Sequence, residues 1–329
     1  MNRRLAIYEL RSAFGLAPEQ GQALEDLARL GGEPPALATW LARTLVVLGG
    51  GLLGLGVILW VAANWPDLAR ASKFALLEGL VVLSVAGAIW RPAARSGLLL
   101  LAFLAQGGVL AFFGQTYQTG ADPWQLFALW AALGLPLAAA AHSGALWLPF
   151  SLVVMTAISL WVQAHAGYRW GFSPEAASVH YVGWLLAAGV AVVFSPLPAL
   201  QRRLNAGAWT YRASLLLALG QLCPTSLMAL FDSDSGPHYG AGLLIATLYA
   251  VCVSRRRVFD VFALCLAGLT LDVLVIGGLA WLIMDAHSNA ILSFLVLGLL
   301  SAIIVAATAA ALRQLVRRHE QRLQTETQP

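Results

Sequence analysis

Apolar runs about 20 residues long recur along this chain, and they constrain its fold more than any other feature. A helix of about 20 residues is long enough to cross the roughly 30 Å hydrocarbon layer of a bilayer. Only 11% of the 329 residues are charged and 59% are hydrophobic, which leaves too little polar surface to coat a water-soluble body. The sequence therefore excludes a soluble enzyme, a nucleic-acid-binding domain and a disordered tail.

The predicted fold is an all-α, polytopic transmembrane helical bundle. Backbone groups in lipid must form hydrogen bonds within the spanning segment, which favours helices, and the short alternating strands of a membrane barrel are absent from the sequence. Hydropathy windows of about 19 residues predict ten spans. They run near Leu41–Ala63, Ala71–Trp90, Gly97–Gln115, Trp124–Ala141, Ala145–Gln163, Val179–Pro198, Tyr211–Phe231, His238–Ser254, Val258–Met284 and Asn289–Leu312.

Basic residues are distributed unevenly between the two sides of this predicted bundle. Seventeen of the 20 basic residues fall on the side that holds both termini, and Arg70, Lys73 and Arg169 fall on the other. Short loops rich in arginine face the cytoplasm, so the sequence predicts that both termini are cytoplasmic. The pI near 9.2 then reflects topology and attraction to anionic lipid headgroups, and nucleic acid is not an expected partner.

Residues 1–38 precede the first span and are predicted to form a cytoplasmic helical hairpin. One helix is expected over Arg3–Phe14 and a second over Pro18–Leu30, with Gly15 at the turn and Pro18 at the first helical position. The second helix carries one leucine stripe, which favours a hairpin packed on the inner face over a docking site for a partner. The bundle is expected over residues 39–312 and a basic cytoplasmic tail over 313–329.

Four polar side chains fall inside the predicted spans and are the intramembrane candidates: Glu78, Gln106, Gln221 and Asp272. An ionisable group is costly in a bilayer and marks a functional site by default, so we expect both carboxylates to face the bundle interior. One interpretation is a proton-linked cavity lined by all four residues. The other is that the two carboxyl groups only hold helices together.

The segment Gly114–Pro123 is predicted to be a polar, nearly uncharged outer loop, and its candidate residues are Gln115, Tyr117, Gln118 and Asp122. Amide and phenol groups could bind a polar ligand there. A hydrogen-bonded loop beside an aromatic belt is the favoured alternative, because such belts are general in membrane proteins.

Four histidines, His165, His180, His238 and His287, are predicted on outer loops. Their spacing matches no metal-binding motif, so solvated loop histidines are favoured over a metal site. The three cysteines are expected to be apolar fillers, and the chain lacks the motifs of phosphate-binding loops and serine hydrolases. We expect no cofactor.

Two segments and the N-terminal turn resemble a known family. The segments are Val61–Phe74 (VAANWPDLARASKF) and Phe113–Phe127 (FGQTYQTGADPWQLF), and the turn follows a Leu-x-x-x-x-Gly-Leu pattern with Glu-Gln after it. They are similar to the bacterial family called "domain of unknown function 2157", over roughly Leu5 to Trp161. The resemblance implies a multi-pass protein of the bacterial inner membrane with no established activity. It also implies a second membrane protein, with a Gly-Asp-Tyr motif, as a partner.

Three functions fit the sequence. The favoured one is a non-enzymatic, transporter-like protein for a small solute or lipid, because ten spans with both ends inside match carriers built from five-plus-five repeats. A membrane scaffold or assembly factor working through a partner protein is the alternative. A membrane-embedded enzyme with an outer His/Asp site is the third.

Overall fold

The computed structural model describes residues 13–20, 23, 37–64, 68–117, 120–167, 174–231, 236–255, 258–286 and 290–327. Contacts divide the chain into two units, Met1–Gly49 and Gly50–Pro329. In the first unit, Gly15 has a left-handed φ of 57° and a helical segment begins at Pro18. The Ala17 N–H donates to Gln20 Oε1 over 3.2 Å. Most of the predicted hairpin lies outside the described residues.

Every long element of the described chain is a helix, which confirms the all-α prediction. The α-helices are α3 (Leu37–Ala63), α4 (Arg70–Trp90), α5 (Arg95–Tyr117), α6 (Pro123–Ala141), α7 (Gly144–His165), α8 (Ala177–Val193), α9 (Pro198–Leu204), α10 (Gly207–Met228), α11 (Gly236–Val253), α12 (Val261–Ala286) and α13 (Ala290–Thr327). Short 3-10 turns precede α5 and α8 and follow α10: η1 (Pro92–Ala94), η2 (Pro174–Ala176) and η3 (Ala229–Phe231).

Eight of the helices are long and apolar enough to span a membrane: α3, α4, α5, α6, α7, α10, α12 and α13. A ninth span is formed if α8 and α9 are taken together, although the two are bent by 79°. The remaining predicted span corresponds to α11, whose apolar part, Pro237–Val253, is shorter. Length and composition therefore support eight to nine of the ten predicted spans.

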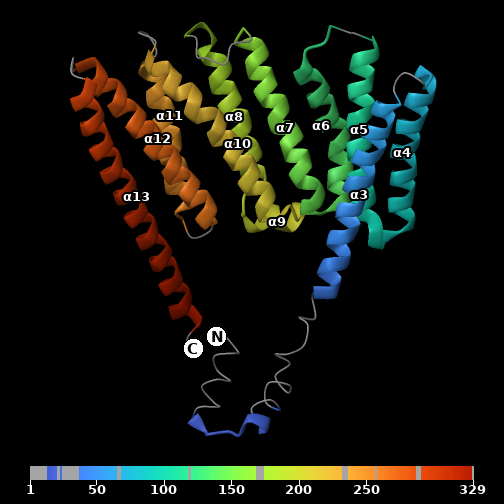
Figure 1. The fold of residues 1–329 in the computed structure, drawn as a ribbon, viewed down its shortest axis with the longest axis horizontal. Helices are drawn as coiled ribbons and strands as arrows, with labels where there is room; N and C mark the ends of the chain where they lie inside the picture. The colour runs from blue at the N-terminus through green and yellow to red at the C-terminus, as the bar shows by residue number, and fades with distance from the viewer. Residues whose placement is uncertain are drawn as a thin grey trace. The chain divides into compact units, whose positions relative to one another are not determined.

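Consecutive long helices of the second unit run in alternating directions (Figure 1). We call the end at which α4 begins and α5 finishes the upper end; α7 and α10 also finish there, and α8 and α11 begin there (Figure 1). Neighbours along the chain pack as pairs from α4 to α8. Helix α10 contacts α7, α8, α11 and α12, and its residues Thr210, Ser214 and Leu215 are almost fully buried, so the core of this part lies around α10.

Small residues bring α5 and α6 close together. Gly107 of α5 faces the indole of Trp130, and Gly134 of α6 faces the ring of Phe103, so a side chain at either glycine would overlap its neighbour. The Trp130 indole N–H donates to the carbonyl of Phe103 over 3.0 Å. Helices in lipid associate through such close packing and through interhelical hydrogen bonds.

The turn between α6 and α7 is joined to the turn between α9 and α10. His142 and Asn205 end α6 and α9 in the left-handed conformation, with φ of 48° and 50°. The Asn205 amide donates to the carbonyl of His142 over 2.9 Å, and the Trp147 indole donates to the carbonyl of Leu204 over 2.8 Å. These bonds hold the lower ends of four helices together.

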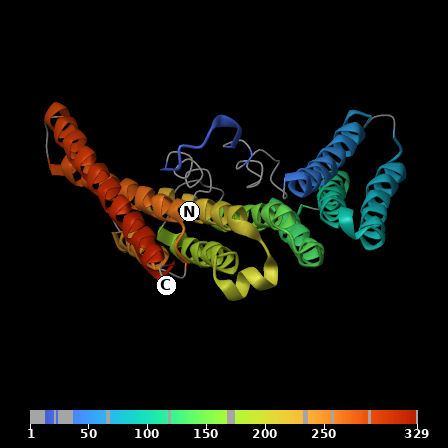
Figure 2. The ribbon, with the colours of Figure 1, turned by 90° about the horizontal axis from the view of Figure 1, so that it is seen from below.

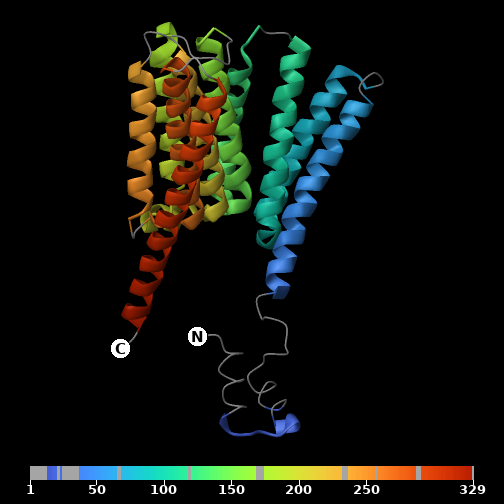
Figure 3. The same cartoon turned by 60° about the vertical axis from the view of Figure 1, so that its left-hand side comes forward.

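Two elements depart from simple membrane crossings. Helix α9 begins with Pro198 at its first position and turns sharply away from α8 (Figure 2). Helix α13 has 38 residues and continues without a break through the segment predicted as a tail. Its C-terminal part extends past the lower ends of α11 and α12 (Figure 3).

Candidate functional site

A polar cavity of about 230 Å³ lies between α7, α8 and α10. Each helix contributes two polar side chains one turn apart, since residues at i and i+4 share a helix face. The pairs are Ser159 and Gln163 from α7, His180 and Trp184 from α8, and Gln221 and Thr225 from α10. Val162, Gly220 and Pro224 complete the lining, so six of the nine lining residues carry a hydrogen-bonding group, and the rest of the exposed wall is hydrocarbon.

Hydrogen bonds between these side chains fix the positions of the three helices around the cavity. The Gln221 amide donates to the hydroxyl of Ser159, which donates in turn to the carbonyl of Met155 over 3.0 Å. The Trp184 indole donates to the Thr225 hydroxyl over 3.2 Å. Helix α10 is thereby tied to α7 and to α8 by groups that face the same space.

Pro224 changes the backbone of α10 beside the cavity. Proline has no N–H, so the carbonyl of Gly220, four residues earlier, loses its helical donor. The Thr225 hydroxyl donates to the carbonyls of Gln221 and Leu222 over 2.8 Å and 3.2 Å, and the Ser226 hydroxyl donates to the carbonyl of Leu222 over 2.7 Å. These hydroxyls bond to carbonyls in the turn around Pro224, and the carbonyl that loses its usual helical donor belongs to Gly220, which lines the cavity.

Two histidines are buried at the upper end of the cavity. His180 is 3% exposed and His238 is 2% exposed, and their ring centroids lie 5.8 Å apart. The His238 ring also packs on Trp184, at 4.4 Å, and on Tyr181, at 4.8 Å. The prediction of solvated loop histidines is wrong for these two, because α8 and α11 begin before them and place both rings inside the bundle.

The intramembrane candidates are dispersed over the bundle. Gln221 lines the cavity; Glu78, Gln106 and Asp272 do not. Asp272 is 7% exposed and accepts a 2.6 Å hydrogen bond from Thr308 of α13, so it faces the interior as predicted. Glu78 is exposed on α4, so the prediction that it faces inward is wrong. Gln106 is half-buried on α5, and its Oε1 atom has no hydrogen-bond partner among the described residues.

The predicted outer loop begins later than expected. Helix α5 continues to Tyr117, so Gln115 and Tyr117 are exposed on its last turn, and the Tyr117 ring packs on Phe113 at 4.8 Å. Asp122 is half-buried at the start of α6 and its side chain makes no capping bond. Gln118 lies outside the described residues.

His165, unlike the buried pair, lies at the surface of the described part of the chain. His165 is exposed at the end of α7, where its ring packs on Trp161 at 4.7 Å and contacts the Trp161 carbonyl through Nδ1 at 2.9 Å. His287 lies outside the described residues, as do Asp232 and Asp234. Within the described part of the chain, no three His, Cys, Asp or Glu side chains are arranged to hold a metal ion.

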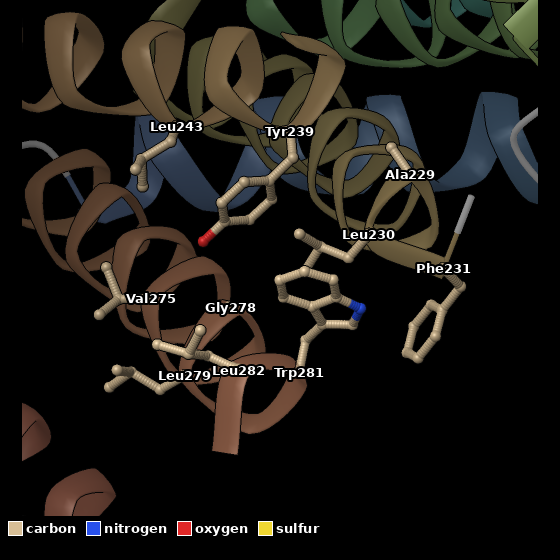
Figure 4. Close-up of a pocket in the computed structure, with 10 residues that line it drawn as sticks. All are labelled: Ala229, Leu230, Phe231, Tyr239, Leu243, Val275, Gly278, Leu279, Trp281 and Leu282. Atoms are coloured by element: carbon tan, nitrogen blue, oxygen red, sulfur yellow. The ribbon is translucent and has the colours of Figure 1, made fainter. Parts of the chain in front are cut away.

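A larger apolar pocket, about 730 Å³, lies where η3, α11 and α12 meet. Tyr239 and Trp281 point toward one another across it from α11 and α12 (Figure 4). The Tyr239 hydroxyl donates to the carbonyl of Leu274 over 2.8 Å and is therefore already satisfied. Tyr239 and Trp281 are the polar side chains of this pocket, whereas the cavity between α7, α8 and α10 has six, which makes that cavity the stronger candidate site.

Sequence reasoning identified Gln221 and missed most of its companions. Ser159, Gln163, Trp184 and Thr225 were not singled out, although each forms an i, i+4 polar pair on an apolar helix. That spacing is a usable signal, because a polar face on a helix in lipid requires a partner.

Comparison with known proteins supports the membrane assignment. Residues 9–147 match the family model described as "Predicted membrane protein (DUF2157)". The predicted resemblance is thereby confirmed over α3 to α6 and the first turn of α7. The polar cavity lies C-terminal to the matched segment. Neither a curated protein nor a solved structure matches the chain.

Proposed function

We propose that this protein is a non-enzymatic, transporter-like membrane protein that binds a small, uncharged polar solute in the cavity between α7, α8 and α10. The observation that carries the proposal is the convergence of three i, i+4 polar pairs on one volume of about 230 Å³. Polar groups inside a membrane bundle are costly, and they mark substrate pathways when they line a common space.

The lining defines the class of solute. It holds two amides, two hydroxyls, an indole N–H and an imidazole, and it contains no carboxylate, lysine or arginine. With the imidazole neutral, such a surface donates and accepts hydrogen bonds but does not neutralise a fixed charge. Pockets for drug-sized ligands start at about 300 Å³, so the solute is smaller than these.

We also propose that solute flux is linked to protons, and this part of the proposal rests on His180. It is the ionisable side chain of the lining, and the His238 ring lies beside it, with the ring centroids 5.8 Å apart. Histidine changes charge near neutral pH more readily than any other side chain. The carboxylates of Glu78 and Asp272 lie away from the cavity and have no role in this proposal.

We also propose that the protein lies in the bacterial inner membrane with both termini in the cytoplasm. The clustering of arginines on one side of the predicted bundle supports this orientation. In that arrangement the upper end, with His180 near the mouth of the cavity, faces outward.

Solute flux into liposomes tests the function directly. The full-length protein is reconstituted, and the uptake of urea and glycerol is followed by light scattering. We expect the wild-type protein to accelerate uptake over protein-free liposomes. We expect Gln221→Leu and Thr225→Val to reduce the acceleration at least severalfold, because each removes hydrogen-bonding groups from the lining. Leu216→Ala is the matched control, since Leu216 is exposed on the same helix.

Two further results bear on this proposal. We expect the wild-type flux to depend on pH and His180→Gln to remove that dependence, because glutamine does not titrate. Equal flux in wild-type and protein-free liposomes would contradict the proposal.

The second candidate function is a membrane scaffold, and one observation favours it. Only 6% of the residues in the membrane window of α13 are buried, so the sides of this helix that α12 does not cover are open to a partner helix. Absence of flux would favour this function.

A further inference from the structure

A second polar pocket, about 410 Å³ in volume, lies at the upper end between the start of α4 and the last turns of α5. Four of its six lining residues are polar: Arg70 and Lys73 from α4, and Gln115 and Thr116 from α5. Leu68 and Phe112 supply the rest. It shares no residue with the solute cavity, and it lies inside the segment that matches the membrane-protein family.

The charge of this pocket is unusual for its side of the molecule. The predicted topology leaves three basic residues at the upper end, and two of them line this one pocket. Among the residues that the structure describes, no acidic one lines this pocket. Lys73 is the single lysine of the chain and is only 6% exposed, with its ammonium 6.0 Å from the centre of the Phe112 ring. Two basic side chains therefore line the pocket, and one of them is buried.

Arg70 and Lys73 offer complementary donors. A guanidinium presents a rigid fork of N–H donors that matches two phosphate oxygens. The guanidinium of Arg70 makes no ion pair within the part of the chain that the structure describes. Lys73 has further contacts in the protein, but an ammonium carries three donors and can bind a phosphate oxygen in addition. The amide of Gln115 and the hydroxyl of Thr116 can each donate to the remaining oxygens.

The backbone adds to this preference. Helix α4 begins at Arg70, its cap residue Ala69 forms no side-chain capping bond, and its first turn contains no acidic residue. The N–H groups of that turn carry partial positive charge and favour an anion near them. Arg70, the first residue of α4, lines the pocket, so this helix end lies beside the two basic side chains.

We propose that this pocket binds a phosphate group at the membrane surface. Helix α4 begins its span at Arg70 and α5 completes its span at Tyr117, which puts the pocket at the boundary of the hydrocarbon layer. Lipid phosphates occupy this level, and free phosphate reaches it from water. Both sources present the same oxygens to the two cations.

Lipid retention and phosphate titration distinguish the two sources. The full-length protein is purified in a nonionic detergent, incubated with phosphatidylglycerol, and the retained lipid is measured by native mass spectrometry. Inorganic phosphate is titrated in a parallel sample by calorimetry. Retained lipid that phosphate does not displace identifies the headgroup as the ligand, and heat of binding with phosphate alone identifies the free anion.

Charge-removing variants provide the decisive comparison. We expect Arg70→Gln and Lys73→Gln each to weaken binding about tenfold, since each removes a charged hydrogen-bond donor. Arg91→Gln is the matched control, because Arg91 is exposed at the opposite end of the same helix. Lys73 is buried, so Lys73→Gln can fail to fold. Arg70 is exposed, so Arg70→Gln tests the proposal even if the lysine variant does not fold. The proposal would be overturned if wild type, Arg70→Gln and Arg91→Gln bound the ligand equally well. It would also be overturned if none of the three bound it.

Failure of the phosphate proposal can be distinguished from failure of the proposed solute function. Arg70 does not line the cavity between α7, α8 and α10, so Arg70→Gln is expected to leave urea and glycerol flux unchanged.

Discussion

Glycines decide how closely several helices of this protein approach. Gly144, the first residue of α7, faces the backbone carbonyl of Ala206, which cannot move aside as a flexible side chain could. Close backbone approach of this kind is a common role of small residues in membrane helices. The joined turns at the lower end of the bundle depend on it.

The substitution Gly144→Ala is expected to lower the thermal stability of the protein in detergent. The added methyl group would overlap the Ala206 carbonyl, and overpacking typically costs about 1–3 kcal/mol. Gly189→Ala is the matched control, because open space surrounds Gly189 and alanine favours helix there. A Gly144→Ala variant as stable as Gly189→Ala would show that this approach is not close in solution.

Single residues were the hardest features to predict from the sequence. Asp272 was predicted to face inward and does, and Gln221 was predicted to line a cavity and does. Glu78 was also predicted to face inward, but it is exposed. In lipid, both faces of a helix are apolar, so the periodicity that marks the core face of a soluble helix is lost. Burial then depends on which helices are neighbours, which the sequence does not state.

Helices α12 and α13 pack against each other and are joined by one polar contact. The Thr308 hydroxyl donates to Asp272 Oδ1 over 2.6 Å, and Gly268 lies one turn before Asp272 and faces Thr308 as well. A polar contact between two apolar helices specifies their register, because any shift leaves a carboxyl group without a donor.

Removing the donor is therefore expected to destabilise this pair of helices. Thr308→Val should lower the free energy of unfolding by about 1–3 kcal/mol, since it leaves a buried acceptor unsatisfied. Asp272→Asn retains a carbonyl acceptor and should cost less. Unfolding in a detergent mixture measures both. If Thr308→Val unfolds like the wild type, this contact does not hold α12 against α13.

Element positions could be predicted well, and element ends less well. The apolar windows located the long helices because hydrocarbon thickness sets their length. They did not predict that α5 would continue to Tyr117 or that α13 would continue to Thr327. Hydropathy falls at both points, but neither segment contains proline, and Leu, Arg, Gln and Glu in the C-terminal part are good helix formers.

At the scale of the whole molecule, the arrangement of arginines predicts an orientation that can be tested. We expect a green fluorescent protein fused after the C-terminus to fluoresce, because both termini are proposed to be cytoplasmic. Alkaline phosphatase inserted between α5 and α6 is expected to be active, since it would fold outside the cell. A fluorescent protein that stays dark at the C-terminus, with active phosphatase there, would contradict the proposed topology.

Helix α13 has a mechanical consequence. Its 38 residues make a rod about 57 Å long, nearly twice the thickness of the hydrocarbon layer. It contains no proline, and its single glycine, Gly298, lies in the first third, so the projecting arm has no hinge at which to bend. His319 on that arm stacks on Phe259, with ring centroids 4.0 Å apart. The stacked pair therefore ties the C-terminal part of α13 to the segment between α11 and α12.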